Sequence, residues 1–267
     1  MAVNLVLRGA FRICKNRQVL VSYKVCHLDT AGTFLGMVSG CVPEVLVARI
    51  TGPQTTSNLG KNVYFRILNN DASGEMTYLL ADQDAREAVL IDPHGRDLPL
   101  LLALLAEREL HLCWVLRTHH HDALLPDEPD QLAQLGAPVV QGDALAALQL
   151  ADGAALPFGD ELVRILATPG HTPHCLSFGW RDRLFCGGLL ALAACPHQPR
   201  PAEPEALWDS VTQRVFTLPD ETLLFAGHEQ RARAVSTALE QRRWHPFFAG
   251  LTRDEFLAQM AALPENK

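Results

Sequence analysis

The sequence predicts an α/β protein in which two layers of β-sheet are covered by helices. Short apolar runs rich in β-type residues alternate with helical segments over residues 61–267. The first of these runs are separated only by turn residues, as in hairpins, whereas the last third of the chain becomes helical. Because strands and helices interleave in this way, the helices are expected to form outer layers on a sandwich of sheets.

The expected strands are short and are separated by turn-forming residues. Val63–Leu68 is followed by Asn69-Asn70-Asp71, which favours a turn. Leu112–Arg117 is an apolar run that leads directly into a group of histidines. The other predicted strands are Met76–Leu80, Ala88–Ile91, Pro138–Val140, Glu161–Ala167, Leu176–Trp180, Leu184–Cys186 and Leu223–Phe225.

The expected helices carry recognisable start and stop residues. Asp97 is placed to cap a helix over about Leu98–Leu110. Gly136 is placed to end a short helix over Asp130–Leu135. The remaining predicted helices begin after Asp143, run from Pro204 toward Thr217, and follow Thr252, which has the capping-box spacing to Glu255.

Composition and charge exclude several classes of function. The chain has 267 residues, 48% of them hydrophobic, which is enough for a sizeable core. Its formal net charge of −7 argues against nucleic-acid binding, which needs a basic face. No apolar run reaches about 18 residues, so neither a membrane span nor a membrane partner is expected. The seven cysteines form no CxxC pair, which favours reduced thiols in a cytoplasmic protein.

The first 60 residues differ from the rest of the chain. Residues 41–60 are rich in Pro, Gly, Thr, Ser and Asn, as in a linker. Residues 1–60 are therefore expected to be a leader or linker that packs poorly against a single domain over residues 61–267. Arg8, Arg12 and Lys15 would share one face of an amphipathic helix, as in a transit peptide, which in a eukaryote would direct the chain to the mitochondrial matrix. Serine is scarce in this segment, and a poorly ordered leader is the alternative.

Histidines stand at the ends of three expected strands. Thr118-His119-His120-His121-Asp122 follows an apolar strand, and His119 and His121 are spaced so that both rings can turn to one point. His171 follows a Pro-Gly turn, and His228 follows a glycine. Neutral imidazole is a common ligand of zinc, iron and copper. Each segment alone is also compatible with a solvated loop or a plain turn, but three strand-end histidines together favour a built site.

The chain also carries motifs that recur in one enzyme family. Thr168-Pro169-Gly170-His171-Thr172 matches its TPGHT sequence, and Thr77–Leu80 with Ala88–Pro93 matches its opening hairpin. Its C-terminal third is matched by Ser210-Val211, Val215–Pro219, Gly227-His228, Val235–Thr237 and Pro246. On these residues the chain, from about Tyr64 to Leu263, resembles the persulfide dioxygenase branch of the metallo-β-lactamase superfamily, sister to glyoxalase II. The resemblance implies an αββα fold with two mixed sheets covered by helices.

The departures from the family pattern fall on its metal ligands. The signature T-H-x-H-x-D-H is kept at His119 and His121, but Ala123 and Leu124 replace its Asp and its last His. Gly188 stands where the family has a metal-binding Asp, and the segment R-G-C-G-R-T-D-F-Q that follows survives only as Cys195. Two neighbouring metal ions repel each other, and the carboxylates that would offset this charge are missing. At most one metal ion is therefore expected.

The resemblance implies a metal-dependent enzyme that acts on sulfur-containing small molecules, most like a glutathione persulfide dioxygenase. The expected ligands of one Fe(II) or Zn(II) ion are His119, His121, His171 and His228, and no catalytic residue is assigned. The expected substrate is a small thiol, persulfide or thioester, such as a glutathione derivative. The alternatives are a glyoxalase II-like thioester hydrolase and a degenerate, non-catalytic homologue that binds weakly or serves as a partner. A further alternative is that the histidines are remnants that hold no metal. The sequence leaves open whether the chain forms a homodimer.

The resemblance also makes Gly188 a test position. If Gly188 lies beside His119 and His171, Gly188→Asp should complete a triad of two histidines and one carboxylate. The affinity for Fe(II) is then expected to rise at least about tenfold.

Overall fold

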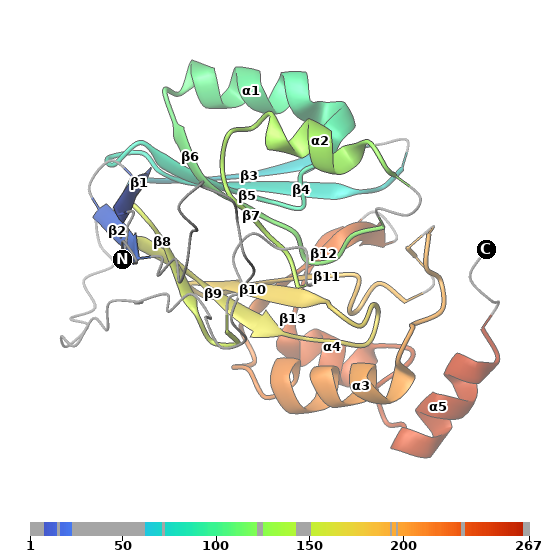
Figure 1. Ribbon diagram of the computed structural model, residues 1–267. Coiled ribbons are helices and arrows are strands. Elements are labelled where there is room, and N and C mark those ends of the chain that lie inside the picture. Colours follow the sequence, from blue (N-terminus) through green and yellow to red (C-terminus); the bar gives the residue numbers. More distant parts are fainter. Residues whose placement is uncertain are drawn as a thin grey trace, which may run out of the picture. The chain divides into compact units, whose positions relative to one another are not determined.

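Two β-sheets face each other in the computed structural model, and helices cover the outer face of each sheet (Figure 1). The structure describes residues 8–14, 17–22, 62–70, 73–121, 125–142, 151–192, 194–195, 197–230 and 233–263. Contacts divide the chain into two units, Met1–Gly60 and Lys61–Lys267, and each unit is described by itself.

The described part of the first unit is a hairpin. Strand β1 (Arg8–Cys14) pairs antiparallel with β2 (Arg17–Ser22). The amphipathic helix expected here is therefore wrong for Arg8 and Arg12, because both residues lie in a β-strand. Lys15 and the predicted linker over residues 41–60 lie outside the described residues. The leader role of residues 1–60 stays a prediction.

The first sheet of the second unit has five strands in the order β3-β4-β5-β6-β7. Its antiparallel half leads into a parallel half at the β5–β6 pair. The parallel connections pass through two helices, α1 (Leu98–Glu107) and α2 (Glu128–Ala133), which lie on the outer face of this sheet (Figure 1). The strands are β3 (Val63–Asn69), β4 (Met76–Asp82), β5 (Glu87–Ile91), β6 (His111–Leu116) and β7 (Val139–Val140).

The second sheet has six strands in the order β13-β12-β11-β10-β9-β8, and only β11 and β12 pair in parallel. Its strands are β8 (Ala155–Phe158), β9 (Glu161–Ala167), β10 (Leu176–Trp180), β11 (Arg183–Gly187), β12 (Leu223–Gln230) and β13 (Arg233–Thr237). Its outer face carries α3 (Pro204–Asp209), a π-helical turn η2 (Ser210–Val215), α4 (Ala238–Trp244) and α5 (Arg253–Ala261).

Aromatic side chains fill the space between the sheets. Tyr78 on β4 lies 4.9 Å from Phe185 on β11 and 5.6 Å from Phe225 on β12, measured between ring centroids. Phe65 on β3 stacks beside Tyr78 and meets Trp180 of the second sheet at 6.1 Å. Aromatic pairs at these distances add to the free energy of folding beyond the area they bury. They fix the two sheets, and hence the loops at their ends, in one arrangement.

Two mixed sheets covered by helices confirm the predicted fold class. The bounds of β9 and β10 are those predicted, and Thr252 and Glu255 form the predicted capping box. Asp97 precedes α1 as expected, but its side chain caps nothing. A short 3₁₀ turn, Gly95–Asp97, holds the Asp97 backbone away from the extended conformation that a capping side chain needs.

The helix predicted after Asp143 lies outside the described residues. In the part of the chain that the structure describes, none of the helices combines the length and the apolar character that crossing a membrane requires.

Candidate metal centre

His119 and His121 leave the first sheet where β6 ends. Thr118, directly after this strand, donates a hydrogen bond from its Oγ1 to Asp92 Oδ2 (2.8 Å), and its backbone N–H donates to Asp92 Oδ1 (2.6 Å). The Thr118 hydroxyl oxygen lies 2.9 Å from His119 Nδ1. Because the hydroxyl proton is directed to Asp92, His119 Nδ1 carries the proton of that contact, and the lone pair of the ring is on Nε2. Asp92 therefore fixes both the orientation and the tautomer of His119.

His171 reaches the same region from the second sheet, on a turn after β9. Its side chain is fully buried at 0% exposure, and its Nε2 has no hydrogen-bond partner among the residues that the structure describes. The turn is held by its backbone, since the His171 carbonyl accepts from Ala202 N (3.0 Å) and from the Gln198 side chain. A buried, unpaired ring nitrogen carries a free-energy penalty unless a partner satisfies it. The unpaired Nε2 of His171 points to such a partner.

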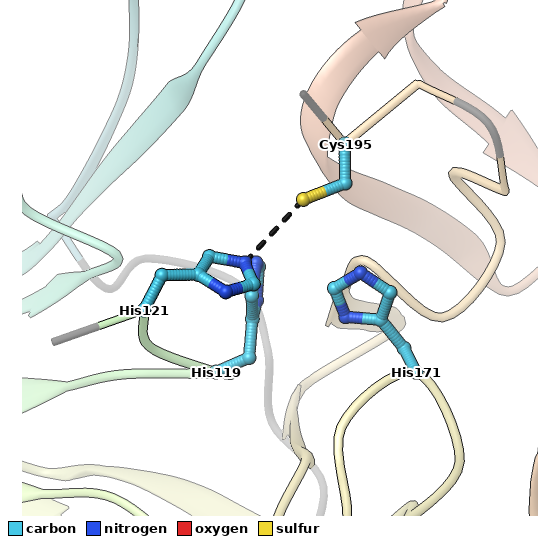
Figure 2. A group of neighbouring side chains, drawn as sticks. All are labelled: His119, His121, His171 and Cys195. Atoms are coloured by element: carbon cyan, nitrogen blue, oxygen red, sulfur yellow. Dashed lines mark hydrogen bonds between the residues drawn. The ribbon is translucent and has the colours of Figure 1, made fainter. Parts of the chain in front are cut away.

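Cys195, on the loop after β11, brings a thiol to the two groups of histidines (Figure 2). Its Sγ lies 3.4 Å from His121 Nε2, and Cys195 is 0% exposed. One ligand atom from each of His119, His121, His171 and Cys195 can be chosen so that all four lie within 4.8 Å of one another. The ring centroids of His119 and His171 are 4.8 Å apart, with nearly perpendicular planes. The four side chains form a group of the size that holds one metal ion, which we call the centre.

Burial keeps the imidazoles of the centre neutral. Burial, together with the charges of neighbouring histidines, lowers the pKa of His171 to about 3 and that of His121 to about 4. The pKa of His119 is lowered in the same direction and for the same two reasons. A metal ligand must offer a lone pair, so neutral imidazole is the form that binds. The donor set therefore fits a transition-metal ion.

A pocket opens beside the centre. His228, on β12, lines this pocket; it is 4% exposed, and neither of its ring nitrogens has a hydrogen-bond partner. Glu75 also lines the pocket. Burial raises the pKa of its carboxyl group, but His94 and the Arg96 guanidinium together lower this pKa by more, and it lies at about 2. The other residues lining the pocket are Asp92, Pro93, Arg117, His119, His120, His121, Leu125, Glu128, His197 and Gly227.

Three of the four histidines predicted as metal ligands come together in the centre. The fourth, His228, has its ring 5.9 Å from that of His119 and lies outside the four-residue group. The sequence reasoning did not select Cys195 as a ligand. One signal was available, because Cys195 is the residue that survives from an otherwise altered family segment beyond Gly188. All ligand assignments, including that of His228, stay predictions.

Comparisons with known proteins support the fold and show the family. The mitochondrial persulfide dioxygenase ETHE1 of Homo sapiens is 31% identical over 217 residues, covering 76% of this chain and 83% of the relative. The crystal structure of ETHE1 from Myxococcus xanthus has a TM-score of 0.67 at 35% identity, with 75% of this chain and 92% of that chain covered. The chain belongs to the persulfide dioxygenase ETHE1 family.

This chain also has relatives in a second enzyme class. A hydroxyacylglutathione hydrolase of Shewanella sp. (strain ANA-3) is 33% identical over 161 residues, which is 55% of this chain and 59% of the hydrolase. No protein-family model matches the sequence. The persulfide dioxygenase assignment therefore rests on relatives that match three quarters or more of the chain.

Gly188 separates this chain from the persulfide dioxygenase pattern. A Cβ atom at position 188 would lie 2.5 Å from both Cε1 and Nδ1 of His171. Real Cβ atoms do not approach a ring this closely, so any side chain at 188 would push the His171 imidazole away. The geometry thus reverses the expected effect of Gly188→Asp on Fe(II) affinity. Position 188 does face His171, but the imidazole ring occupies the space that the new side chain would need.

Gly188→Asp is expected to weaken metal binding at least about tenfold, a change of about 1.4 kcal/mol. The displaced His171 ring would leave the other members of the centre. Titration with Zn(II) and with Fe(II), each beside the parent protein, measures the effect. Gly188→Ala is the control, because it adds the same Cβ without a carboxylate and should weaken binding equally. Tighter Fe(II) binding by the Asp variant alone would show that a carboxylate at 188 can bind the metal.

Proposed function

We propose that the chain is a metal-dependent enzyme acting on sulfur-containing small molecules, most like a glutathione persulfide dioxygenase. The observation that carries the proposal is the meeting of three neutral imidazoles, from His119, His121 and His171, beside a pocket. The family supports the substrate class, since its members are named for persulfide and the hydrolases for a glutathione ester. The mitochondrial names of the mammalian relatives support a mitochondrial location in a eukaryotic cell.

Some residues of the site would orient a metal ligand, and others would contact a molecule in the pocket. Asp92, through Thr118, keeps the His119 lone pair directed into the centre. His228 offers two unpaired ring nitrogens to a molecule in the pocket, so it can both donate and accept a hydrogen bond. One Fe(II) or Zn(II) ion would supply Lewis acidity at the centre, and iron would add oxygen chemistry.

A non-catalytic, metal-binding homologue is the second candidate. The observation that favours it is Gly188, which offers no carboxylate and leaves no room for one beside His171. The altered segment that ends in Cys195 points the same way, because the resemblance places part of the family's substrate site there. The two candidates share the metal and differ in turnover.

Turnover assays on protein purified without chelator separate the candidates. Elemental analysis is expected to find no more than one transition-metal ion per chain. Of the ligands that the resemblance implies for a second ion, only His228 is present. We expect oxygen consumption with glutathione persulfide, lost after metal removal and regained on reconstitution. Hydrolysis of a glutathione thioester without oxygen consumption would assign the chain to the hydrolase reaction. A fully metal-loaded protein that turns over neither substrate would contradict an enzyme function.

A further inference from the structure

The Cys195 thiol lies where a metal ligand is needed. It is buried, and Figure 2 shows its Sγ directed at the histidine rings. In a tetrahedral site with bonds of about 2.0–2.1 Å to nitrogen and about 2.3 Å to sulfur, neighbouring nitrogen and sulfur atoms are about 3.6 Å apart. The observed separation of Cys195 Sγ and His121 Nε2 is 3.4 Å. This pair already has the spacing of two ligands on one ion, whereas the widest pair of the group, at up to 4.8 Å, would draw closer on binding.

Building on the proposed metal-dependent function, we propose that Cys195 is the fourth protein ligand of the centre, beside His119, His121 and His171. The family pattern has one anionic ligand, the Asp at the position of Gly188, which this chain lacks. A thiolate at Cys195 would place one negative charge next to the ion, from further along the same loop after β11 that begins at Gly188. The retained thiol would thus supply the charge that position 188 does not.

Neighbouring groups do not meet the same conditions as Cys195. The Cys175 thiol lies 3.8 Å from His171, but on the Nδ1 side of the ring, whereas Nε2 is the unpaired nitrogen. Cys175 also accepts from the Thr172 backbone N–H (3.2 Å), and it is not one of the four residues of the centre. The His228 ring is 5.9 Å from His119 and borders the pocket.

Ligation by Cys195 leaves the centre open on one side. His171 and Cys195 are both fully buried, whereas His119 and His121 line the pocket. A substrate would therefore approach past the two pocket histidines and not past the thiolate. Catalytic zinc sites keep a position for water or substrate and can become five-coordinate in the transition state. A centre with four protein ligands is compatible with the proposed enzyme function if it takes up a further ligand from the pocket side.

A thiolate changes which metal the centre prefers. Sulfur ligands select zinc over harder ions, and zinc exceeds iron(II) in the general order of affinities. Three imidazoles and one thiolate are accordingly expected to hold Zn(II) more tightly than Fe(II), by at least about tenfold. The preference for iron that the two-histidine, one-carboxylate arrangement implies is lost together with the carboxylate.

Cobalt substitution tests the ligand directly, without an activity assay. Co(II) added to the metal-free protein should give an intense near-ultraviolet absorption from charge transfer between sulfur and cobalt. Cys195→Ser should abolish this band and weaken Zn(II) binding at least tenfold. The matched control is Cys175→Ser, which removes a second buried thiol next to His171 and should keep the band. A band that persists in Cys195→Ser, or disappears only in Cys175→Ser, would overturn the proposal.

X-ray absorption on the zinc-loaded parent protein gives an answer even if a variant fails to fold. One sulfur at about 2.3 Å and nitrogen ligands at about 2.0–2.1 Å are expected. A shell of nitrogen and oxygen alone would mean that Cys195 is not a ligand, while the metal centre itself would stand. Failure of the parent to bind Co(II) or Zn(II) would contradict both this proposal and the metal-dependent function.

Discussion

His171→Ala is expected to abolish metal binding, with a loss greater than the 10–100-fold that is typical when a residue behind a metal ligand is changed. His171 is a predicted ligand on the Pro-Gly turn of the second sheet, and its Nε2 is buried and unpaired among the described residues. Its anchoring contacts to Ala202 and Gln198 use the backbone carbonyl, which alanine retains. The turn should therefore keep its shape while the ligand disappears. Metal content after dialysis and a Zn(II) titration measure the loss.

His174→Ala is the matched control for this experiment. His174 lies three residues further along the same turn, but it is exposed and is not part of the centre. The variant should bind metal like the parent protein. Equal losses from the two substitutions would indicate that the turn has been disturbed, and full retention of metal by His171→Ala would remove His171 from the ligand set.

Gly170→Ala is expected to destabilise the fold by at least about 3 kcal/mol, from a strained backbone angle and a forced overlap together. Gly170 has a φ of +137°, a region that side chains disfavour. A Cβ there would lie 2.3 Å from both N and Cα of Leu207, which are backbone atoms of α3 and cannot rotate away. The free energy of unfolding, measured by urea denaturation, should fall by that amount, and the displaced turn should carry His171 with it.

Gly136→Ala separates the overlap from the backbone angle. Gly136 has a φ of +72°, but a Cβ there would meet no atom within 4 Å. This variant should lose only about 1 kcal/mol, the cost of placing a side chain in the left-handed region. If the two variants were equally stable, the close contact between Gly170 and α3 would not be real.

The strands with strong local signals could be predicted from the sequence. Glu161–Ala167 alternates buried and more exposed residues, and Leu176–Trp180 is apolar and bounded by turn residues, so both bounds were right. Gly136 has the positive φ of a residue that follows a helix, but α2 spans Glu128–Ala133 and not the predicted Asp130–Leu135. Residue alternation and turn chemistry act over a few neighbours, and such patterns can be read from a chain without knowing its fold.

The elements that were missed depend on tertiary contacts. Strand β8 contains Pro157, which argues against a strand within a sheet, but β8 lies at the sheet edge, where proline is tolerated. Strand β13 has the polar sequence RAVST and is formed by pairing with β12. The next helix, α4, begins at Ala238, directly after its N-cap Thr237. No turn-forming residues separate it from β13, so the sequence gives no clear sign of where it begins. Only the folded sheet supplies the partners that these segments need.

The same distinction applies to the candidate site. His119, His121 and His171 follow strands, and strand ends meet at the rims of sheets, so their convergence could be expected. Cys195 follows a loop without periodic pattern after β11, and its position relative to His121 depends on how the two sheets pack. The crowding of Gly188 by His171 likewise exists only in three dimensions.

The centre draws its side chains from both sheets, and this has a consequence for how the protein matures. His119 and His121 belong to the end of the first sheet, whereas His171 and Cys195 belong to the second. During synthesis, neither half of the chain alone carries a complete donor set, and the last donor leaves the ribosome some 75 residues after the first. An ion captured early would be held by two imidazoles at most and would exchange readily. Tight binding of an ion would therefore require both sheets to be docked. Metal binding is then expected to follow folding and not to initiate it.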